Sequence, residues 1–530
     1  MKFWISLAFS LLFSCANAQT FPYDVHVRPH YSHPALGVQA FAYAQVKNEI
    51  LIIGGRKDGL HRRQPFASMD SAGMNQFITL YNLADNSILQ ASINSLSTEV
   101  AEQFTSTNME FYQEGNYLYL LGGYGYSPTK QDHQTHPVFT SIYLPDFIQS
   151  IHEHPNQLDG VQYLVNPDYA VTGGALIKME PFYYLVAGNR FDGRYNPMGG
   201  PSYTQTYTEK IRKYTITHEY GAVHVREVGT FENKDLLHRR DLNVMNAISP
   251  SGAEYSVLFS GVFQPAIDLP WQNSITFNAS GYREIPRYVH RMNQYHCAHF
   301  STYNRETLQQ HFIFLGGMGE FYQDGEHFAQ SNDVPFVKTM AVVTQNADST
   351  WKEEILPQRL PYYLGASSEF IPANNLTYCS EHNIDLNALF HNQTDSVLVG
   401  YLLGGIQSNA PNIFWINDGS QSFPNETMYE VWIVKGDVTK HVVLDDVFRV
   451  YPNNTFDRMK IDFTCTELTK VKITVYDYHG KRVLRKRLGT FGAGSHTVTR
   501  RGNFLNKEHF YTLQLDRNGV VTEQRLVVTE

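Results

Sequence analysis

Charged side chains and cysteines are scarce in this sequence of 530 residues. Charged residues make up 18%, whereas aromatic residues reach 14% and hydrophobic residues 42%. Disordered chains have few aromatics and high charge, and coiled coils are built from charged helix formers, so both classes are excluded. Four cysteines are too few for a disulfide scaffold. One disulfide among Cys297, Cys379 and Cys465 remains open, and three buried free thiols are the simpler expectation.

Long apolar runs and catalytic signatures are also missing. Beyond the N-terminal segment, no stretch reaches the roughly 18 uninterrupted apolar residues that a membrane-spanning helix needs. The G-x-S-x-G, H-E-x-x-H, phosphate-loop and calcium-loop patterns do not occur. The carboxylate pair Asp445-Asp446 is expected to be solvated. We therefore predict no metal, no cofactor and no catalytic residue from motifs alone.

The first 18 residues have the pattern of a secretory signal peptide. Lys2 supplies the positive charge, Ile5 to Phe13 form the apolar segment, and Ala16-Asn17-Ala18 is an A-x-A cleavage site. Cleavage before Gln19 is the preferred interpretation. The alternative is a lipid on Cys15, which lies in a loose lipobox. Either way, the mature chain is expected to be exported.

The net charge of −9 conceals two segments of opposite sign. Residues 449–530 carry 15 Lys and Arg against 8 Asp and Glu, whereas residues 1–448 carry 27 against 43. This asymmetry predicts two modules, a body at 19–448 and a tail at 449–530. An acidic body argues against nucleic acid as a partner, and the basic runs of the tail come with no recognition motif.

One pattern recurs six times along the body. Each copy is an apolar run closed by a pair of small residues, namely Gly54-Gly55, Gly122-Gly123, Ala187-Gly188, Ser260-Gly261, Gly316-Gly317 and Gly404-Gly405. A strand-like segment precedes each run across a short turn, and further strands follow a long loop. Four antiparallel strands per copy, repeated around an axis, predict an all-β fold with a β-propeller.

The repeated pattern resembles the kelch repeat over about residues 33–445, and Asp348-Ser349-Thr350-Trp351 resembles the turn and Trp that end many kelch blades. The resemblance implies a six-bladed propeller, or a seven-bladed one if residues 21–34 belong to an extra blade. Ala187-Gly188 and Ser260-Gly261 are conservative departures from the pattern. Kelch-like copper oxidases use Tyr and His ligands, so Tyr295-His296-Cys297-Ala298-His299 is a minority candidate for a copper site. Strand alternation would place His296 and Ala298 on one face of that segment.

Six long loops are expected on one face of the propeller, because each follows the second strand of its copy. They span residues 56–75, 124–137, 189–205, 262–274, 318–335 and 406–427. Loops of this length are usually functional or disordered, so this face is predicted to bind the ligand; the alternative is that its residues only pack the loops onto each other. Aromatic rings beside polar side chains suit either a glycan or a protein partner. The candidate ligand-binding residues are Arg56, Asp58, His61, Arg62, Tyr124, Tyr126, Asn189, Arg190, Asp192, Arg194, Glu320, Tyr322, Asp324 and Trp415.

The tail has a strand pattern of its own and predicts a small Ig-like β-sandwich of about seven strands. Asn518-Gly519 is a strong hairpin signal between two of these strands. The series Arg449-Val450-Tyr451-Pro452-Asn453, then Val475 to Gly480, then Tyr511-Thr512-Leu513 resembles the C-terminal sorting domain of the type IX secretion system in Bacteroidota. The resemblance implies recognition by the type IX secretion machinery, removal of the tail, and release or attachment at the outer-membrane surface.

Together these features predict an exported binding protein, extracellular or at the cell surface, whose loop face takes a glycan or a protein. A carbohydrate-active hydrolase and a copper-type oxidase are the alternatives. A third class, a purely structural surface component, predicts no concave pocket on the loop face.

Overall fold

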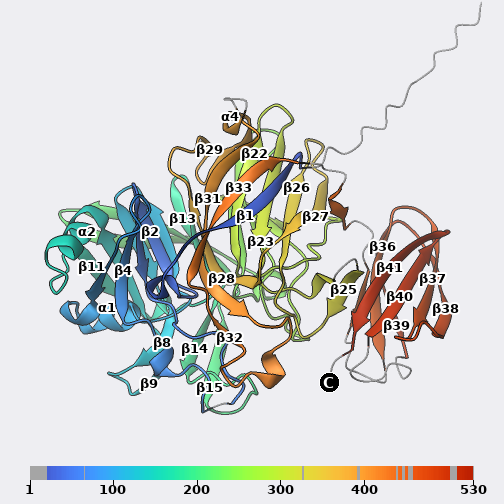
Figure 1. Cartoon of the computed structure of the whole chain (residues 1–530), viewed down its shortest axis with the longest axis horizontal. Helices are drawn as coiled ribbons and strands as arrows, with labels where there is room; N and C mark the ends of the chain where they lie inside the picture. Colours follow the sequence, from blue (N-terminus) through green and yellow to red (C-terminus); the bar gives the residue numbers. More distant parts are fainter. Residues whose placement is uncertain are drawn as a thin grey trace, which may run out of the picture.

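A computed structural model of the chain is mostly β (Figure 1). It describes residues 21–64, 66–324, 327–390, 394–436, 440–444, 448–451, 458–501 and 510–528. The predicted signal peptide and Cys15 lie outside the described residues. We call residues 21–444 the body and residues 449–528 the tail.

The first half of the body contains three antiparallel sheets of four strands each. The first sheet consists of β2 (Ala42–Val46), β3 (Glu49–Ile53), β4 (Phe77–Asn82) and β5 (Ile88–Ser92). The second consists of β6 (Glu110–Glu114), β7 (Tyr117–Leu121), β10 (Val138–Tyr143) and β11 (Val161–Val165). The third consists of β12 (Ala175–Met179), β13 (Phe182–Val186), β16 (Lys210–Glu219) and β17 (Ala222–Glu232).

Three further sheets complete the repeat. The fourth consists of β18 (Asn243–Ile248), β19 (Glu254–Phe259), β20 (Ile275–Asn278) and β21 (Gly281–Glu284). The fifth is built on β22 (Ala298–Asn304), β23 (Gln309–Leu315), β26 (Thr339–Gln345) and β27 (Trp351–Arg359), with β29 (Tyr378–Ser380), β30 (Asn383–Asp385) and β34 (Val442–Val443) at its edges. The sixth has the order β28 (Tyr363–Pro372), β31 (Ser396–Ser408), β33 (Thr427–Lys435) and β1 (Tyr23–Ser32), and β32 (Ser422–Pro424) pairs with β31.

The N-terminal strand β1 belongs to the sixth sheet. It pairs antiparallel with β33, from Tyr23 opposite Lys435 to Ser32 opposite Thr427. The two ends of the body therefore share one sheet, which ties the first described residues to the last repeat.

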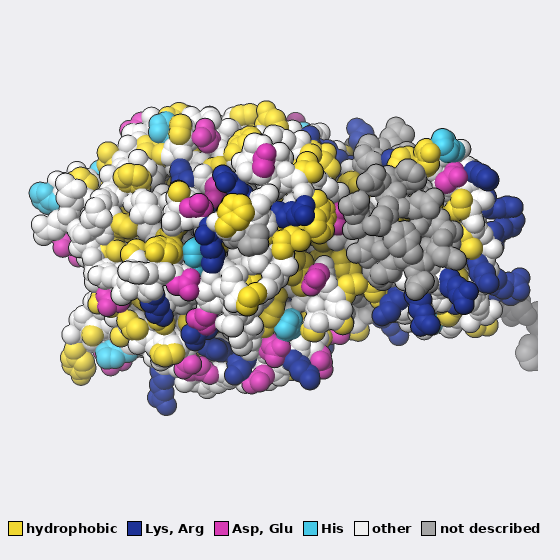
Figure 2. All heavy atoms as spheres, turned by 90° about the horizontal axis from the view of Figure 1, so that it is seen from below, with side chains coloured by type: hydrophobic (Ala, Val, Ile, Leu, Met, Phe, Trp, Pro, Cys, Tyr) yellow, Lys and Arg dark blue, Asp and Glu magenta, His cyan; other side chains and the backbone are white. Residues whose placement is uncertain are grey.

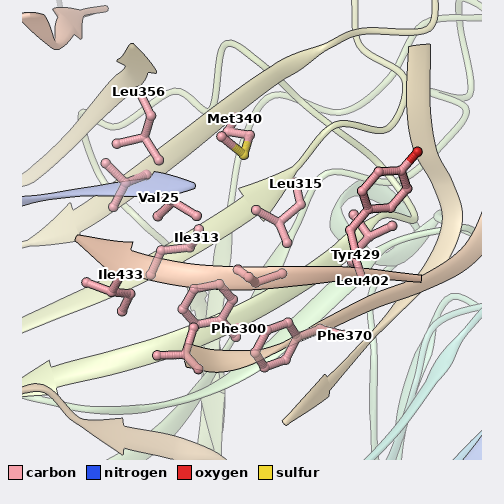
Figure 3. Close-up of a cluster of buried hydrophobic side chains, with 14 of the residues drawn as sticks. Val25, Phe300, Ile313, Leu315, Met340, Leu356, Phe370, Leu402, Tyr429 and Ile433 are labelled. Carbon is pink, nitrogen blue, oxygen red and sulfur yellow. The ribbon is translucent and has the colours of Figure 1, made fainter. Parts of the chain in front are cut away.

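The sheets pack face to face through six hydrophobic clusters, each shared by two successive sheets. Figure 3 shows the cluster between the fifth and sixth sheets, where Phe300 and Leu315 meet Phe370 and Leu402. The last cluster joins the sixth sheet to the first, because Leu403 packs with Ile50 and its neighbours. Successive packing of this kind brings the sheets into a ring.

The small-residue pairs have left-handed backbone; five of them follow the second strand of their sheet directly, and Gly404-Gly405 lies within β31. Both glycines of the first pair have positive φ, 70° at Gly54 and 82° at Gly55. The departures Ala187 and Ser260 keep the same conformation, with φ of 52° and 56°. A side chain at Gly122 would place its Cβ 1.8 Å from the carbonyl oxygen of Val171. The close approach and the positive φ explain why small residues occupy these pairs.

Helices are few and short. They are α1 (Thr98–Gln103), α2 (Leu144–Glu153), α3 (Lys234–Leu237) and α4 (Leu386–Leu389), with single 3₁₀ turns at Pro34–Leu36, Ser71–Gly73, Ile93–Ser95, Pro167–Tyr169 and Phe414–Ile416. Apolar side chains of α1 and α2 fill the cluster between the first two sheets. Among the described residues, no helix is long and apolar enough to cross a membrane.

The tail consists of two sheets that share one hydrophobic core. One has β35 (Arg449–Tyr451), β36 (Met459–Cys465) and β39 (Gly494–Arg500), and the other has β37 (Thr469–Tyr476), β38 (Arg482–Phe491), β40 (Phe510–Arg517) and β41 (Val520–Val527). The hairpin predicted at Asn518-Gly519 joins β40 to β41, and both residues have positive φ, as a tight hairpin turn requires.

The six long loops lie at the end of the second strand of their sheet, and three of them build new structure. β8 (Tyr124–Ser127) and β9 (Asp132–Thr135) of the second loop join β14 (Asn189–Gly193) and β15 (Tyr203–Tyr207) of the third in one sheet. β24 (Phe321–Asp324) and β25 (His327–Ser331) of the fifth loop extend a sheet of the tail. Figure 1 shows β8, β9, β14, β15 and β32 at one end of the body, opposite α4 and β29. We call this end the loop face.

Candidate functional site

Six residues, one from each sheet, form a ring; five of them lie just before the first strand of their sheet, and Ser367 lies within β28. All have left-handed backbone, with φ of 52° at Ala40, 53° at Asn108, 68° at Gly173, 51° at Asp241, 42° at His296 and 57° at Ser367. Five of the six are not glycine, and left-handed backbone at such residues is strained and clusters at functional sites. The repeat therefore places one strained residue per sheet around a common centre.

Backbone hydrogen bonds connect the members of this ring. The amide of Asp241 donates to the carbonyl of Gly173 (2.6 Å), that of Gly173 to Asn108 (3.1 Å), and that of Asn108 to Ala40 (3.0 Å). The series continues from Ala40 to Ser367 (2.9 Å) and from Ser367 to His296 (2.6 Å). Only His296 and Asp241 are joined through side chains instead, with Nδ1 3.7 Å from Oδ1.

The polar side chains of this ring meet in one cluster, which we call the floor: Asn108, Asp241, His296 and Ser367. The amide Nδ2 of Asn108 donates to Asp241 Oδ1 at 3.0 Å and lies 3.3 Å from His296 Nδ1. Ser367 Oγ lies 3.5 Å from the same nitrogen. An amide nitrogen can only donate, so Nδ1 accepts, and the proton of the neutral imidazole sits on Nε2.

The charge state of the floor follows from its burial. The side chains of His296 and Asp241 are 22% and 24% exposed. Burial lowers the pKa of His296, while the neighbouring carboxylate of Asp241 opposes the shift. At neutral pH the floor thus offers a neutral imidazole beside one carboxylate.

A cavity of about 680 Å³ opens above the floor. Loops from five of the six sheets line it, among them His61, Tyr195, Phe263, Met318 and Trp415. Figure 2 views the loop face, where hydrophobic, basic and acidic side chains are intermixed near the middle of the body. The cavity therefore combines aromatic and aliphatic walls with a polar base, within the usual size range of small-molecule sites.

Aromatic rings hold the guanidinium of Arg240 next to the floor. The guanidinium of Arg240 lies 5.2 Å from the ring centre of Phe191 and 5.7 Å from those of Tyr195 and Phe263. Its Nε is 3.6 Å from a carboxylate oxygen of Asp241. The rings fix the guanidinium by cation–π contact and leave it at the cavity wall, beside the floor.

His61 supplies a second imidazole higher in the cavity. Its ring packs edge-on against Tyr195 at 5.2 Å and against Phe414 at 6.1 Å. Burial, and then the positive charges of Arg240 and Arg56, lower its pKa to about 4. This histidine is neutral at physiological pH.

Three of the fourteen predicted ligand-binding residues line this cavity: Arg56, His61 and Trp415. Arg56 is 4% exposed and its guanidinium is held by Asp58, at 2.8 Å and 2.5 Å, and by the carbonyl of Asp70. Trp415 is 45% exposed, with the guanidinium of Arg63 over its ring. Arg56 therefore braces the wall, whereas Trp415 is accessible.

Six more predicted residues gather in or beside the sheet formed by the second and third loops. They are Tyr124, Tyr126, Asn189, Arg190, Asp192 and Arg194. The hydroxyl of Tyr124 donates to the carbonyl of Gly193 and accepts from the amide of Tyr195, both at 2.8 Å. Arg190 pairs with Asp192 on the surface. None of these six residues lines the cavity. Their sheet supports Tyr195, which lies in the cavity wall together with Pro197.

The remaining predicted residues lie elsewhere. Arg62 is exposed beside Gly419 of the sixth loop. Tyr322 is part of β24, and the side chain of Asp324 lies outside the described residues. Glu320 is completely buried and is paired with Arg449 of the tail instead of facing the cavity.

Sequence reasoning missed the floor residues Asn108, Asp241 and Ser367. Asn108 and Asp241 lie just before the first strand of their sheets and Ser367 lies inside β28, and none of these positions carries a motif. The segment Tyr295-His296-Cys297-Ala298-His299 is a sequence candidate, but the positive φ of His296 breaks the strand alternation expected there. Tyr295 and His296 line the cavity, whereas Cys297 is buried between the fourth and fifth sheets.

Metal and disulfide chemistry find no support among the described residues. Within these residues, no group of three or more His, Cys, Asp and Glu side chains is arranged to hold a metal ion. Cys297, Cys379 and Cys465 are free, and the first and last of them are buried. The expectation of free thiols is confirmed, while Cys379 is only partly buried.

The tail matches a known protein family. Residues 449–529 match the family model of the secretion system C-terminal sorting domain. This domain marks proteins exported by type IX secretion to the cell surface or the extracellular space, and it implies contact with that machinery. The predicted destination is confirmed.

No curated protein matches the chain. Among solved structures, the chain is similar to the protein titled "Structure of YjhT", at 10% identity and a TM-score of 0.42, over 79% of this chain and 99% of that one. It is also similar to a fungal alcohol oxidase of the AA5 family in complex with copper, at 10% identity and a TM-score of 0.37, over 95% of this chain and 99% of that one.

Proposed function

We propose that the body is a six-bladed kelch-type propeller that binds a glycan in the cavity above the floor, outside the cell. In this proposal, residues 19–448 form the binding module and residues 449–530 form an Ig-like sorting module. The single observation that carries the proposal is the axial cavity, in which Asn108, Asp241, His296 and Ser367 converge.

The chemistry of the cavity favours a sugar over a flat protein surface. A sugar has hydroxyl groups that both donate and accept, and the floor offers a carboxylate, an amide, a hydroxyl and an imidazole Nε2–H. Its apolar ring faces suit flat walls such as Tyr195, Phe263 and Trp415. A cavity of about 680 Å³ has room for one or two sugar rings and is too narrow for a folded partner.

The test is binding of the full chain to a glycan array, followed by calorimetry on the best ligand. Asp241→Asn keeps the size of the side chain but removes the charge, and we expect affinity to fall by at least about tenfold, the effect of losing one charge-assisted hydrogen bond. Asp348→Asn is the matched control, because Asp348 is exposed in the turn between β26 and β27. Equal affinity of the two variants would contradict the proposal.

A second candidate function is hydrolysis of the bound glycan. Three carboxylates line the cavity, Asp241, Asp268 and Asp333, and a pair of carboxyl groups across a sugar is what glycosidases need. Reducing sugar released from the array-selected ligand, and abolished by Asp241→Asn or Asp268→Asn, would establish catalysis. Binding without any turnover leaves the binding function alone.

A further inference from the structure

The fifth loop connects the body to the tail through a shared sheet. Strand β25 pairs in parallel with β41, with Ala329 opposite Arg525, Gln330 opposite Leu526 and Ser331 opposite Val527. The sheet of the tail therefore continues into a hairpin that belongs to the body, and Figure 1 shows β25 between the two. We call residues 318–335 the docking loop.

A buried ion pair reinforces this contact. Both guanidinium nitrogens of Arg449 that face Glu320 donate to its carboxylate, Nε to Oε1 at 2.8 Å and Nη2 to Oε2 at 2.6 Å. The two side chains are 6% and 0% exposed. Gln272 and Gln330 donate to the same carboxylate at 3.2 Å and 2.8 Å. A bidentate pair with every oxygen engaged is strong and geometrically specific.

Gln330 makes a third set of contacts that resembles strand pairing. Its Nε2 donates to the carbonyl of Val450 at 2.6 Å, and its Oε1 accepts from the amide of Val450 at 3.0 Å. Gln524 of β41 donates to the same Oε1 at 3.2 Å. Gln330 is fully buried, so its side chain serves the contact with the tail and not the solvent.

These three sets of contacts do not depend on the peptide connection between body and tail. The ion pair joins residues 129 positions apart, and the contacts of Gln330 span 120 and 194 positions. Opposite net charges of the acidic residues 1–448 and the basic residues 449–530 favour association at long range. Without the tail, β25 would be an open strand edge and Glu320 a carboxylate without its cation.

We propose that the docking loop is a built receptor for the tail, which stays bound to the body after the connecting segment is cut. The occupant is this chain's own sorting domain. Cutting the connecting segment would then not release the tail. Release would also require a factor that displaces β41 from β25. This inference does not rest on the proposed glycan binding.

The experiment uses the full chain with a protease recognition sequence inserted between residues 445 and 446, which lie outside the described residues. After complete cleavage, size-exclusion chromatography and native mass spectrometry report whether the two fragments stay together. We expect co-elution at about 1 µM, corresponding to a Kd at or below that value. A folded tail that elutes alone at about 10 µM would overturn the proposal, and so would a tail that unfolds and leaves.

Two variants locate the receptor, and one controls for charge removal. In the cleaved chain, we expect Glu320→Gln to weaken retention by at least about 30-fold, because it leaves Arg449 buried without its partner. Gln330→Ala removes both bonds to Val450 and should weaken retention in the same direction. Glu254→Gln, on an exposed residue of β19, should leave retention unchanged. Retention in both docking-loop variants equal to that of the unmodified cleaved chain would show that the docking loop is not the receptor.

Discussion

Replacing Glu110 by Gln should remove a pH dependence from the stability of the body. Glu110 lies at the start of β6, two residues beyond Asn108 of the floor, and is 2% exposed. Its Oε1 accepts from the amide of Gly174 at 2.7 Å, while Oε2 has no hydrogen-bond partner among the described residues. Burial is the main cause that raises its pKa to about 8, and the charge of Asp241 adds to it.

The sign and size follow from linkage. A carboxyl whose pKa is about 8 in the folded chain and about 4.5 in the unfolded chain stays protonated when folded and ionises on unfolding. Its contribution to stability is fully present below pH ~4.5 and is lost as the pH rises toward 8. The loss is at most about 1.4 kcal/mol per pH unit, or up to ~2.7 kcal/mol between pH 5 and pH 7.

The assay is urea unfolding followed by tryptophan fluorescence at pH 5, 6, 7 and 8 for the wild type and Glu110→Gln. The glutamine is neutral throughout and keeps the acceptor for the amide of Gly174. We expect the variant to gain stability relative to the wild type as the pH rises, while buried histidines such as His290 and His311 cancel in the difference. Glu254→Gln, an exposed control, should follow the wild type. A constant difference between Glu110→Gln and wild type across this range would refute the reasoning.

Three further predictions address the floor, the core and the repeat. Asn108→Ala removes the donor that keeps Nδ1 of His296 unprotonated, so the pKa of His296 should rise, as measured by nitrogen-detected NMR titration; an unchanged pKa would contradict the assigned tautomer. Leu402→Ala should cost about 2–5 kcal/mol of unfolding free energy in denaturant titration, because its side chain is fully buried between the fifth and sixth sheets. Gly122→Ala should prevent folding or lower the thermal midpoint strongly, whereas Gly115→Ala, also at positive φ but with open space around it, should cost only about 1 kcal/mol; similar midpoints for both would show that close approach does not matter at Gly122.

The sequence alone was sufficient for features that depend on neighbouring residues. An apolar run that ends in a small pair such as Gly54-Gly55 predicts a buried strand and a left-handed turn, because both effects act within a few residues of the chain. The same holds for Asn518-Gly519 in the tail, where the turn conformation is a local preference of these two residues. The family of the tail and the destination of the protein were predicted from the order of such local patterns.

The candidate site could not be predicted in this way. Asn108, Asp241, His296 and Ser367 lie between 55 and 259 positions apart and meet only because the ring of sheets brings the first strands together at one centre. Because the loops between the repeats differ in length, these residues do not recur at a constant spacing in the sequence. The loop residues predicted to bind a ligand therefore mostly stabilise the loops themselves. The sequence did not indicate the polar residues at the centre.

The role of Glu320 shows the same division. By composition, Glu320 and its aromatic neighbours on the fifth loop suited a ligand, and nothing near them in the sequence pointed to Arg449. The pairing of β25 with β41 buries that carboxylate against a cation 129 positions away. The sequence by itself determined which segments are strands and where the chain is sent, because those depend on local pattern. Only the tertiary structure decided which polar groups share a cavity and which bind the tail, because both depend on distances between residues remote in the chain.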